Sequence, residues 1–193
     1  VGTGFFDRDE NYCVNPGEDD LYLIGTSEVP MVSYNAGKIL DLEKPHKYAS
    51  YSMCFRREAG SYGKDTKGIL RVHQFEKVEM VLFCKPEESE KLHEELLAIE
   101  EELMQKLGLP YQVVNVCCGD LGISAAKKYD IEAWLPGQGK FREMTSTSIC
   151  TDFQSRRLNI RYRDEDNKLQ FAHTLNGTAV SSRPLIAIIE NYK

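Results

Sequence analysis

The sequence predicts an α+β fold, with a mainly antiparallel β-sheet flanked by helices. One long stretch has the three- to four-residue apolar spacing of a helix, whereas most other stretches are short runs rich in β-branched and aromatic residues. These runs follow one another with few helices between them, and strands joined in this way usually pair antiparallel. A turn-forming segment, Asp164-Glu165-Asp166-Asn167, separates two of the runs as expected for a hairpin.

The composition is that of a globular domain with a buried core. The chain has 193 residues, of which 41% are hydrophobic and 28% charged. No linker-like run or internal repeat divides it, so residues 1–193 are treated as one domain. A net charge of -6 excludes a uniform basic surface for nucleic acid. Apolar stretches are far shorter than the roughly 20 residues that span a bilayer, so we expect no membrane association and a cytoplasmic location.

The clearest helix is expected from Pro86 to Leu107, because Gly108 and Pro110 follow it. Its apolar spacing is carried by Leu92, Leu96, Ile99, Leu103 and Leu107. Its other face is interpreted as a solvated surface formed by Glu94, Glu95, Glu100, Glu101 and Glu102.

Two long strands are expected at Tyr48 to Arg57 and Arg71 to Cys84. The segment Gly60 to Gly68 between them contains three glycines and two lysines, and we expect a mobile, functional loop there. The further strands expected are Tyr111 to Cys117, Tyr129 to Trp134, Phe141 to Cys150, Arg157 to Arg163 and Leu169 to Leu175. The further helices expected follow Thr26, surround Ile123 to Lys128, and close the chain from Ser181 to Tyr192.

The six cysteines are interpreted as reduced thiols, mostly in strands. No Cys-x-x-Cys pair occurs, and Cys117 and Cys118 would point to opposite faces of a strand. We therefore expect neither a zinc site nor a disulfide.

Charged residues in strands that should be partly buried mark the first candidate site, because an unpaired buried charge is costly. It comprises Met53 to Gly60 and Gly68 to Glu79. Period-two alternation places one set of side chains on one face: Arg71, His73, Phe75, Lys77 and Glu79. Such a face could hold a nucleotide. The spacing alone slightly favours a cross-strand ladder of ion pairs on a solvated face.

Two further clusters have polar side chains suited to phosphate and metal. In Phe141 to Ser148, Glu143 and Ser146 offer oxygen ligands of the kind that Mg²⁺ accepts. In Thr174 to Arg183, an arginine stands at the start of an apolar helix, where a phosphate is favoured. The alternative for this cluster is a surface helix capped by Ser181 or Ser182.

The order of these clusters resembles the catalytic domain of class II aminoacyl-tRNA synthetases, and among them the seryl-tRNA synthetases. The resemblance covers most of the chain, and its most specific part is Arg71-Val72-His73-Gln74-Phe75-Glu76-Lys77-Val78-Glu79. The other matching stretches are Ile24 to Glu28, Cys54 to Glu79, Phe141 to Ser148 and Gly177 to Glu190.

The resemblance implies an antiparallel sheet that holds ATP bent over Mg²⁺, with L-serine beside it. It implies that the catalytic residues are Arg56, on the α-phosphate, and Arg183, near the γ-phosphate and the adenine. The other implied nucleotide contacts are Glu58 on the adenine amino group, Arg71 on the γ-phosphate, Phe75 stacked on adenine, and Val72. The implied Mg²⁺ ligands are Glu143 and Ser146. The implied serine site comprises Thr26 and Glu28 for the ammonium group, Glu79 for the hydroxyl, Asn176 and Arg56.

The resemblance also implies partners outside this chain. The first signature motif of the family, which forms a homodimer interface, and the coiled-coil arm that binds tRNA(Ser) would precede Val1. We therefore expect a piece of a longer protein that does not charge tRNA by itself. The spacing between Asn176 and Arg183 is one residue shorter than in the family, and no role is assigned to Thr178.

The activity implied is that of an ATP-dependent serine-tRNA ligase. The serine carboxylate is ionised at neutral pH and needs no general base to attack the α-phosphorus. Two alternatives remain: a ligase of the same fold that charges a carrier protein, and a non-catalytic binding module. The second is disfavoured because Arg56, Arg71, Arg183 and Glu143 are all present.

Overall fold

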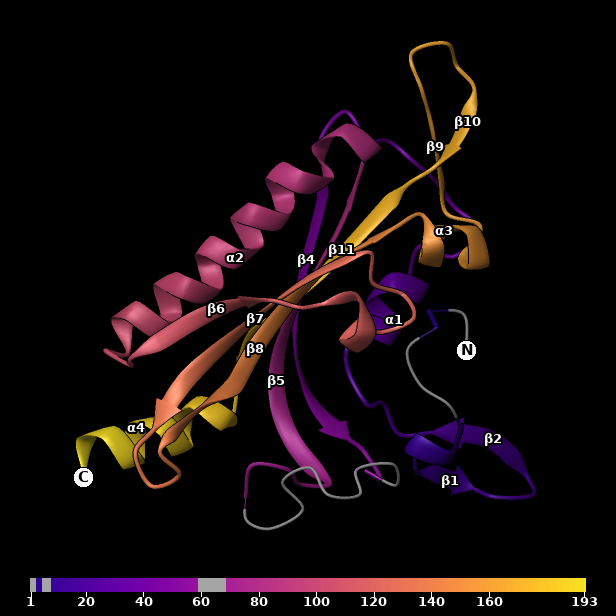
Figure 1. Cartoon of the computed structure of the whole chain (residues 1–193). Coiled ribbons are helices and arrows are strands. Elements are labelled where there is room, and N and C mark those ends of the chain that lie inside the picture. Colours follow the sequence, from indigo (N-terminus) through magenta and orange to yellow (C-terminus); the bar gives the residue numbers. More distant parts are fainter. Residues whose placement is uncertain (1–2, 5–7, 59–68) are drawn as a thin grey trace.

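The computed structural model describes residues 3–4, 8–58 and 69–193. Its centre is a six-stranded sheet in the order β4-β5-β11-β8-β7-β6 (Figure 1). The strands are β4 (His46–Phe55), β5 (Gln74–Cys84), β6 (Tyr111–Asn115), β7 (Lys127–Leu135), β8 (Lys140–Thr151) and β11 (His173–Ser181). Every neighbouring pair in this sheet is antiparallel. The predicted α+β class with a mainly antiparallel sheet is confirmed.

Two helices cover one face of the sheet. Helix α2 (Ser89–Lys106) crosses the sheet diagonally, and α4 (Arg183–Tyr192) lies beside β7 (Figure 1). Both contribute to one apolar cluster: Leu97 and Met104 of α2 and Ala187 of α4 pack with Ile131 and Ala133 of β7. A neighbouring cluster joins α2 to the inner strands β5, β8 and β11. These contacts define the helix face of the sheet.

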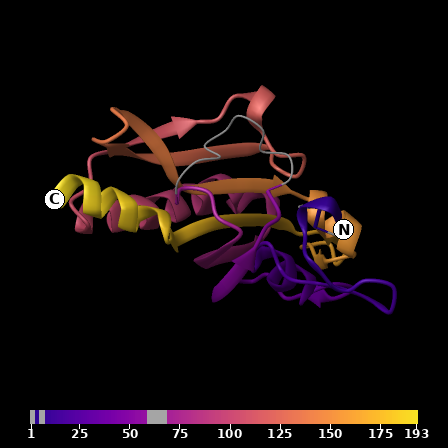
Figure 2. The same cartoon turned by 90° about the horizontal axis from the view of Figure 1, so that it is seen from below.

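Among the residues that the structure describes, the opposite face is covered at one end. Helix α1 (Glu28–Ser33) and a small sheet of β3 (Ile39–Leu40), β9 (Arg161–Arg163) and β10 (Leu169–Phe171) pack there, next to α3 (Phe153–Leu158). Val32, Leu40 and Tyr162 meet Val81 and Phe83 of β5. The N-terminal segments lie at this end and α4 lies at the other (Figure 2). The described residues therefore leave the rest of this face open for a pocket.

Three short helices and one hairpin complete the described part of the chain. The 3₁₀ helices are η1 (Arg8–Glu10), η2 (Pro86–Glu88) and η3 (Cys118–Asp120). The hairpin pairs β1 (Cys13–Asn15) with β2 (Asp19–Tyr22) at the periphery (Figure 1). No helix among the described residues is long and apolar enough to cross a membrane.

The long helix is confirmed, but the prediction of which of its residues are buried is wrong at Ile99 and Glu100. Glu100 was expected on a solvated surface, yet it is 0% exposed. It continues the spacing of Leu96, Leu97 and Met104, so it faces the sheet, whereas Ile99 is exposed. The predicted end holds, since Gly108 follows the helix with a positive φ of 64°.

Four other predictions of elements need correction. No helix forms at Ile123 to Lys128, where Ile123 is exposed and β7 begins at Lys127 because it pairs with β8. The strand expected from Arg157 is shorter, because residues up to Leu158 form α3 around the buried Gln154. The strand expected at Leu169 to Leu175 is divided between β10 and β11, which belong to different sheets.

The fourth concerns the cysteines. Strand β6 ends at Asn115, and Cys117 and Cys118 are exposed beside or in η3 rather than on a strand. All six cysteines are free thiols in this structure.

The predicted loop Gly60 to Gly68 lies outside the described residues.

Candidate active site

A cavity of about 290 Å³ opens on the sheet face opposite α2, and it collects most of the predicted site residues. Strands β5, β8 and β11 form its floor, and the segments that follow β4 and precede β5 and α4 form its rim. The predicted residues that line it are Arg56, Glu58, Arg71, Val72, Phe75, Glu79, Glu143, Ser146, Asn176 and Arg183. Thr26 and Glu28 do not line it, but they are fully or almost fully buried beside it.

A β-bulge in β8 places Glu143 and Ser146 on the same face. Residues three apart on a regular strand point to opposite faces. In β8, however, Glu143 pairs with Glu132 and Thr145 with Ile131, so Met144 is an extra residue. Met144 is buried among the residues of the helix face. The bulge therefore directs a carboxylate and a hydroxyl together into the cavity.

The register of β11 with β5 places Thr178 beside Glu79, just before a second bulge. Thr178 pairs with Glu79 and Val180 with Val78, so Ala179 is the extra residue. The Thr178 hydroxyl donates a hydrogen bond of 3.1 Å to Glu79 Oε2. Thr178 is a site residue to which the sequence assigned no role, and only the strand register reveals it.

Three arginines lie along the cavity, each held by an oxygen of the protein. Arg56 donates from Nε to the Gly25 carbonyl at 3.0 Å, and its guanidinium lies 5.1 Å from the centre of the Phe75 ring. Arg71 forms an ion pair with Glu58. Arg183 Nη1 lies 3.4 Å from Glu143 Oε2 and Nε donates to the Leu70 carbonyl at 3.3 Å. Burial lowers the pKa of Arg56 from its ordinary value, but a guanidinium stays charged at neutral pH.

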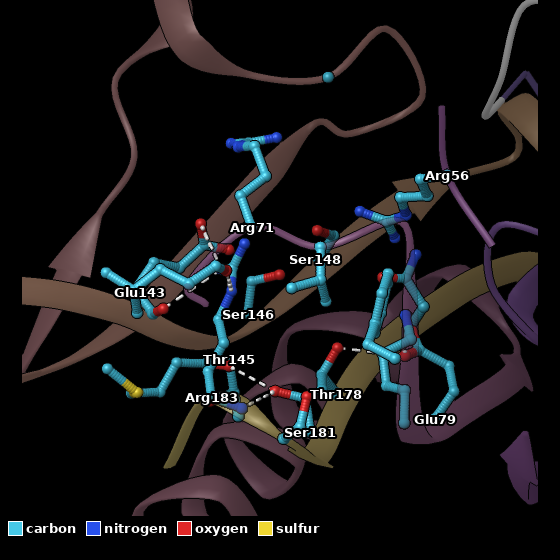
Figure 3. Close-up of a pocket in the computed structure, with 18 of the residues that line it drawn as sticks. Arg56, Arg71, Glu79, Glu143, Thr145, Ser146, Ser148, Thr178, Ser181 and Arg183 are labelled. Carbon is cyan, nitrogen blue, oxygen red and sulfur yellow. Dashed lines mark hydrogen bonds and ion pairs between the residues drawn. The ribbon is translucent and has the colours of Figure 1, made fainter. Parts of the chain in front are cut away.

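The cavity has two chemically different ends (Figure 3). Glu143, Ser146, Arg71 and Arg183 gather at one end, whereas Arg56, Glu79 and Thr178 lie toward the other (Figure 3). The first end offers cations and oxygen ligands, as phosphate groups and their counterion require. The second end offers a buried carboxylate.

The buried end contains a lysine that the sequence analysis gave no role. Lys77 Nζ lies 2.6 Å from Glu79 Oε2 and donates to Thr26 Oγ1 at 2.8 Å. Lys77 is 8% exposed and Glu79 is 2% exposed. Alternation along β5 indicates that the two share a face, but the contact with Thr26 joins segments 51 residues apart.

Glu28 is buried behind this end and does not line the cavity. Its Oε1 accepts hydrogen bonds from Gln154 Nε2 at 2.8 Å and Asn176 Nδ2 at 3.2 Å, while Oε2 is buried without a partner among the described residues. Burial, and then the charge of Glu79, raise the pKa of Glu28 to about 7. Gln154, a residue that the sequence did not indicate, also accepts from Thr174 Oγ1 at 2.7 Å.

The donor set of the cavity fits a magnesium ion that is shared with a nucleotide. Mg²⁺ usually takes one or two carboxylates together with phosphate oxygens and waters. Glu143 and the Ser146 hydroxyl reach the same face through the bulge, and no group of three or more His, Cys, Asp or Glu that could hold a metal occurs in the described part of the chain. The protein oxygens would therefore supply only part of the coordination.

Comparison with known proteins gives one consistent result. A serine-tRNA ligase from Rhodococcus jostii is 56% identical over 194 residues, which cover 100% of this chain and 46% of that protein. The structure of seryl-tRNA synthetase from Pyrococcus horikoshii complexed with ATP superposes with a TM-score of 0.92 at 53% identity, over 99% of this chain and 44% of that one. The cytoplasmic serine-tRNA ligase from Naegleria fowleri in complex with AMP gives 0.89 at 44% identity, over 96% of this chain and 45% of that one.

The chain spans about half the length of the curated relatives it matches. Residues 11–192 match the family described as the tRNA synthetase class II core domain (G, H, P, S and T). That range includes all six strands of the central sheet and every residue placed in the cavity. The chain therefore belongs to the class II tRNA synthetase core domain family.

Proposed function

We propose that the protein is a serine-tRNA ligase, which activates L-serine with ATP to form seryl-adenylate and passes the seryl group to tRNA(Ser). One observation carries the proposal: a single cavity joins an arginine-rich end to a buried carboxylate that already accepts a hydroxyl, from Thr178. The relatives at 56% identity that are named serine-tRNA ligase support it.

The first step needs alignment and charge neutralisation rather than a base. A carboxylate attacks the α-phosphorus and pyrophosphate leaves, so negative charge on the phosphate oxygens must be stabilised. Arg56, fixed by the Gly25 carbonyl, is suited to the α-phosphate, and Arg71 and Arg183 to the far end of the triphosphate. Bound Mg²⁺, held by Glu143 and Ser146, would supply further neutralisation of the phosphates.

The ion pairs of the cavity would exchange partners when the nucleotide binds. Arg71 pairs with Glu58, and Arg183 with Glu143. A triphosphate attracts both arginines more strongly than one carboxylate does, which frees Glu58 for the adenine amino group and Glu143 for the metal. Phe75 and Val72 line the same cavity and offer apolar surface to the base.

Serine recognition is proposed at the buried end. Glu79 accepts the serine hydroxyl, and Glu28 with Thr26 accepts hydrogen bonds from the ammonium group, near Asn176. Oε2 of Glu28 has no hydrogen-bond partner in the described part of the chain, which supports this assignment, because a buried carboxylate oxygen without a donor is costly unless a ligand supplies one. Alanine and glycine would leave Glu79 without its hydroxyl donor, which disfavours them more than a missing methylene does.

The whole protein is proposed to act as a cytoplasmic homodimer that binds tRNA through parts outside this chain. The chain covers 46% of the Rhodococcus relative, so more than half of such a protein remains for those tasks. A net charge of -6 makes this chain a poor tRNA-binding surface by itself, because tRNA affinity depends on phosphate neutralisation by Lys and Arg.

Pyrophosphate exchange with ATP, measured on the full-length protein across the common amino acids, tests the proposal. Exchange should depend on serine, and Arg56→Ala should reduce it by about 100-fold or more, the effect of removing one preorganised group that stabilises the transition state. Arg163→Ala is the matched control, since Arg163 is exposed on β9, away from the cavity. Exchange driven by another amino acid, or near-normal exchange in Arg56→Ala, would overturn the assignment.

A further inference from the structure

Lys77 bridges two groups that the proposed function assigns to the substrate. Its ammonium lies 2.6 Å from Glu79 Oε2 and 2.8 Å from Thr26 Oγ1. A lysine that is 8% exposed is rarely found without a partner, because taking its charge out of water is costly. Here the bridge neutralises that charge and joins β5 to the segment before α1.

The bridge distinguishes the two oxygens of Glu79. Lys77 and Thr178 both donate to Oε2, at 2.6 and 3.1 Å. Within the described ranges, no hydrogen bond to Oε1 occurs. A carboxylate that is held on one oxygen by a cation and a hydroxyl has a fixed rotamer and presents its second oxygen in one direction. Glu79 lines the cavity, so Oε1 is the oxygen left for a ligand.

The charges at this end of the cavity are balanced only when Lys77 is counted. Arg56 and Lys77 are cations, and Glu79 and Glu28 are carboxyl groups; these four groups interact electrostatically, and all but the half-buried Arg56 are buried. A zwitterionic amino acid adds no net charge to a balanced site. Without Lys77, two buried carboxyl groups would face one cation, and one of them would retain a proton.

We propose that Lys77 is a positioning residue that determines specificity for a hydroxyl-bearing amino acid, by fixing Glu79 through Oε2 so that Oε1 meets the substrate hydroxyl. This inference rests on the proposed function. Lys77 stays in place when the amino acid binds, and the substrate ammonium takes the free oxygen of Glu28 rather than the position of the lysine ammonium.

Glu28 gives the inference a pH-dependent readout. Its pKa is raised to about 7 by burial and by Glu79, while Gln154, Lys77 and Arg56 act in the opposite direction. The other groups facing it are Asn176 of β11 and the buried Cys150 of β8. Because the carboxylate form binds the ammonium, serine affinity of the free enzyme should rise as pH increases through about 7. The pH at which half of this rise has occurred is called the pH midpoint below. Removing the positive charge of Lys77, which lowers the pKa of Glu28, should move the pH midpoint upward.

The test uses Lys77→Met and Lys77→Gln in the full-length protein, with serine-dependent pyrophosphate exchange as the assay. Lys77→Met should raise the serine KM by about tenfold or more and leave the ATP KM near its original value, because only the serine end loses a charged contact. The ratio of serine to alanine kcat/KM should fall, and the pH midpoint should rise. Lys77→Gln keeps a hydrogen-bond donor without the charge and should show the same shift of the pH midpoint. It serves as the test if Lys77→Met fails to fold.

Two further variants distinguish a role of Lys77 in positioning Glu79 from a role in stabilising the fold alone. Lys77→Arg keeps the charge and should retain the pH midpoint. Lys47→Met is the matched control, since Lys47 on β4 pairs with Glu95 at 2.9 Å on an exposed surface outside the cavity. It should leave serine KM, selectivity and pH midpoint unchanged.

Two results would overturn the role of Lys77 while leaving the proposed function intact. A lower serine KM in Lys77→Met would mean that the lysine competes with the substrate ammonium. Unchanged KM, selectivity and midpoint in a folded Lys77→Gln variant would mean that it only stabilises the fold. A wild-type protein with no serine-dependent exchange would instead overturn the proposed function, and the role of Lys77 with it.

Discussion

Glu79 and Glu100 are two buried glutamates on opposite faces of one sheet, and they differ in every other respect. Glu79, 2% exposed on the cavity face, is paired with Lys77 and accepts a hydrogen bond from Thr178. Glu100, 0% exposed on the helix face, has no hydrogen-bond partner for either oxygen among the described residues. Burial raises the pKa of Glu100 well above 4.5. Burial alone therefore favours the neutral form of a carboxyl group, whereas nearby cations and hydrogen-bond donors favour its charged form.

The two glutamates are nevertheless close to the same strand. Gly177 of β11 faces α2, and a Cβ at this position would lie 2.8 Å from Glu100 Oε1 and 3.1 Å from Thr147 Oγ1. Only glycine leaves room for the Glu100 carboxyl here. The residues on either side, Asn176 and Thr178, contact Glu28 and Glu79 on the cavity face. Glu100 thus belongs to the support beneath the site, and Glu79 to the site.

The largest effect is expected from removing the cavity-face carboxylate. Glu79→Ala in the full-length protein should raise the serine KM sharply and reduce the serine-to-alanine ratio of kcat/KM by about 100-fold or more, because the substrate hydroxyl loses its charged acceptor. Steady-state pyrophosphate exchange with both amino acids measures the ratio. Glu76→Ala is the matched control, since Glu76 is exposed on the same strand. An unchanged ratio would show that the hydroxyl is bound elsewhere.

A smaller effect, on stability rather than specificity, is expected from the helix-face carboxyl. Glu100→Gln replaces a carboxyl whose pKa is raised by burial with a side chain that is neutral at every pH and has nearly the same shape. Because the folded pKa is raised above the unfolded value of 4.5, the folded state holds the proton longer, and the stability of the wild-type protein falls as pH rises above 4.5. The variant has no carboxyl group to ionise at this position. Its free energy of unfolding relative to the wild-type protein should therefore increase by up to about 1.4 kcal/mol per pH unit.

Urea unfolding of both proteins between about pH 6 and pH 9 measures this difference. Other titrating groups, Glu28 among them, contribute equally to both proteins and cancel in the comparison. Glu102→Gln is the control on the same helix, because Glu102 is exposed and its pKa is lowered by Lys106, which confines its effect to lower pH. A wild-type protein that gains stability with pH relative to Glu100→Gln would show that Glu100 is ionised and has a counterion.

The same comparison shows what could be predicted from the sequence. The structure confirms the end of α2 before Gly108 and the alternation of Phe75, Lys77 and Glu79 on one face of β5, both of which follow from local periodicity. Arg71 and His73, which were predicted to continue this alternation, precede the strand, because β5 begins at Gln74. The prediction that Glu100 lies on a solvated face is wrong: its side chain is polar, but its spacing from Leu96 and Leu97 continues the buried stripe. Periodicity reports position on a helix, but it does not report protonation.

The candidate site could be predicted in its residues but not in its contacts. The clusters on β5, β8 and β11 do meet in one cavity. The bulge at Met144 that directs Glu143 into the cavity and the register that places Thr178 opposite Glu79 leave no signal in the sequence, since they depend on pairing with β7 and β5. The contact of Glu28 with Gln154 spans 126 residues, and the bridge from Lys77 to Thr26 spans 51. Such contacts are decided by the packing of distant segments.

The smallest effect is expected where an ion pair is as short as Lys77–Glu79 but exposed. Lys127 Nζ lies 2.7 Å from Glu90 Oε2, and the two side chains are 30% and 70% exposed. In Lys77–Glu79 the distance is 2.6 Å, and the side chains alone are 8% and 3% exposed. Water solvates the charges of the outer pair in both folded and unfolded states, and Lys127 keeps Glu94 at 3.6 Å when Glu90 is lost. Glu90→Gln should therefore change the free energy of unfolding by less than about 0.5 kcal/mol, whereas Lys77→Gln, which leaves Glu79 buried beside Glu28, should cost about 3 kcal/mol or more. Urea denaturation of the two variants at one pH and salt concentration compares them directly. Equal losses would mean that the distance between the charges, rather than their burial, determines what an ion pair contributes in this fold.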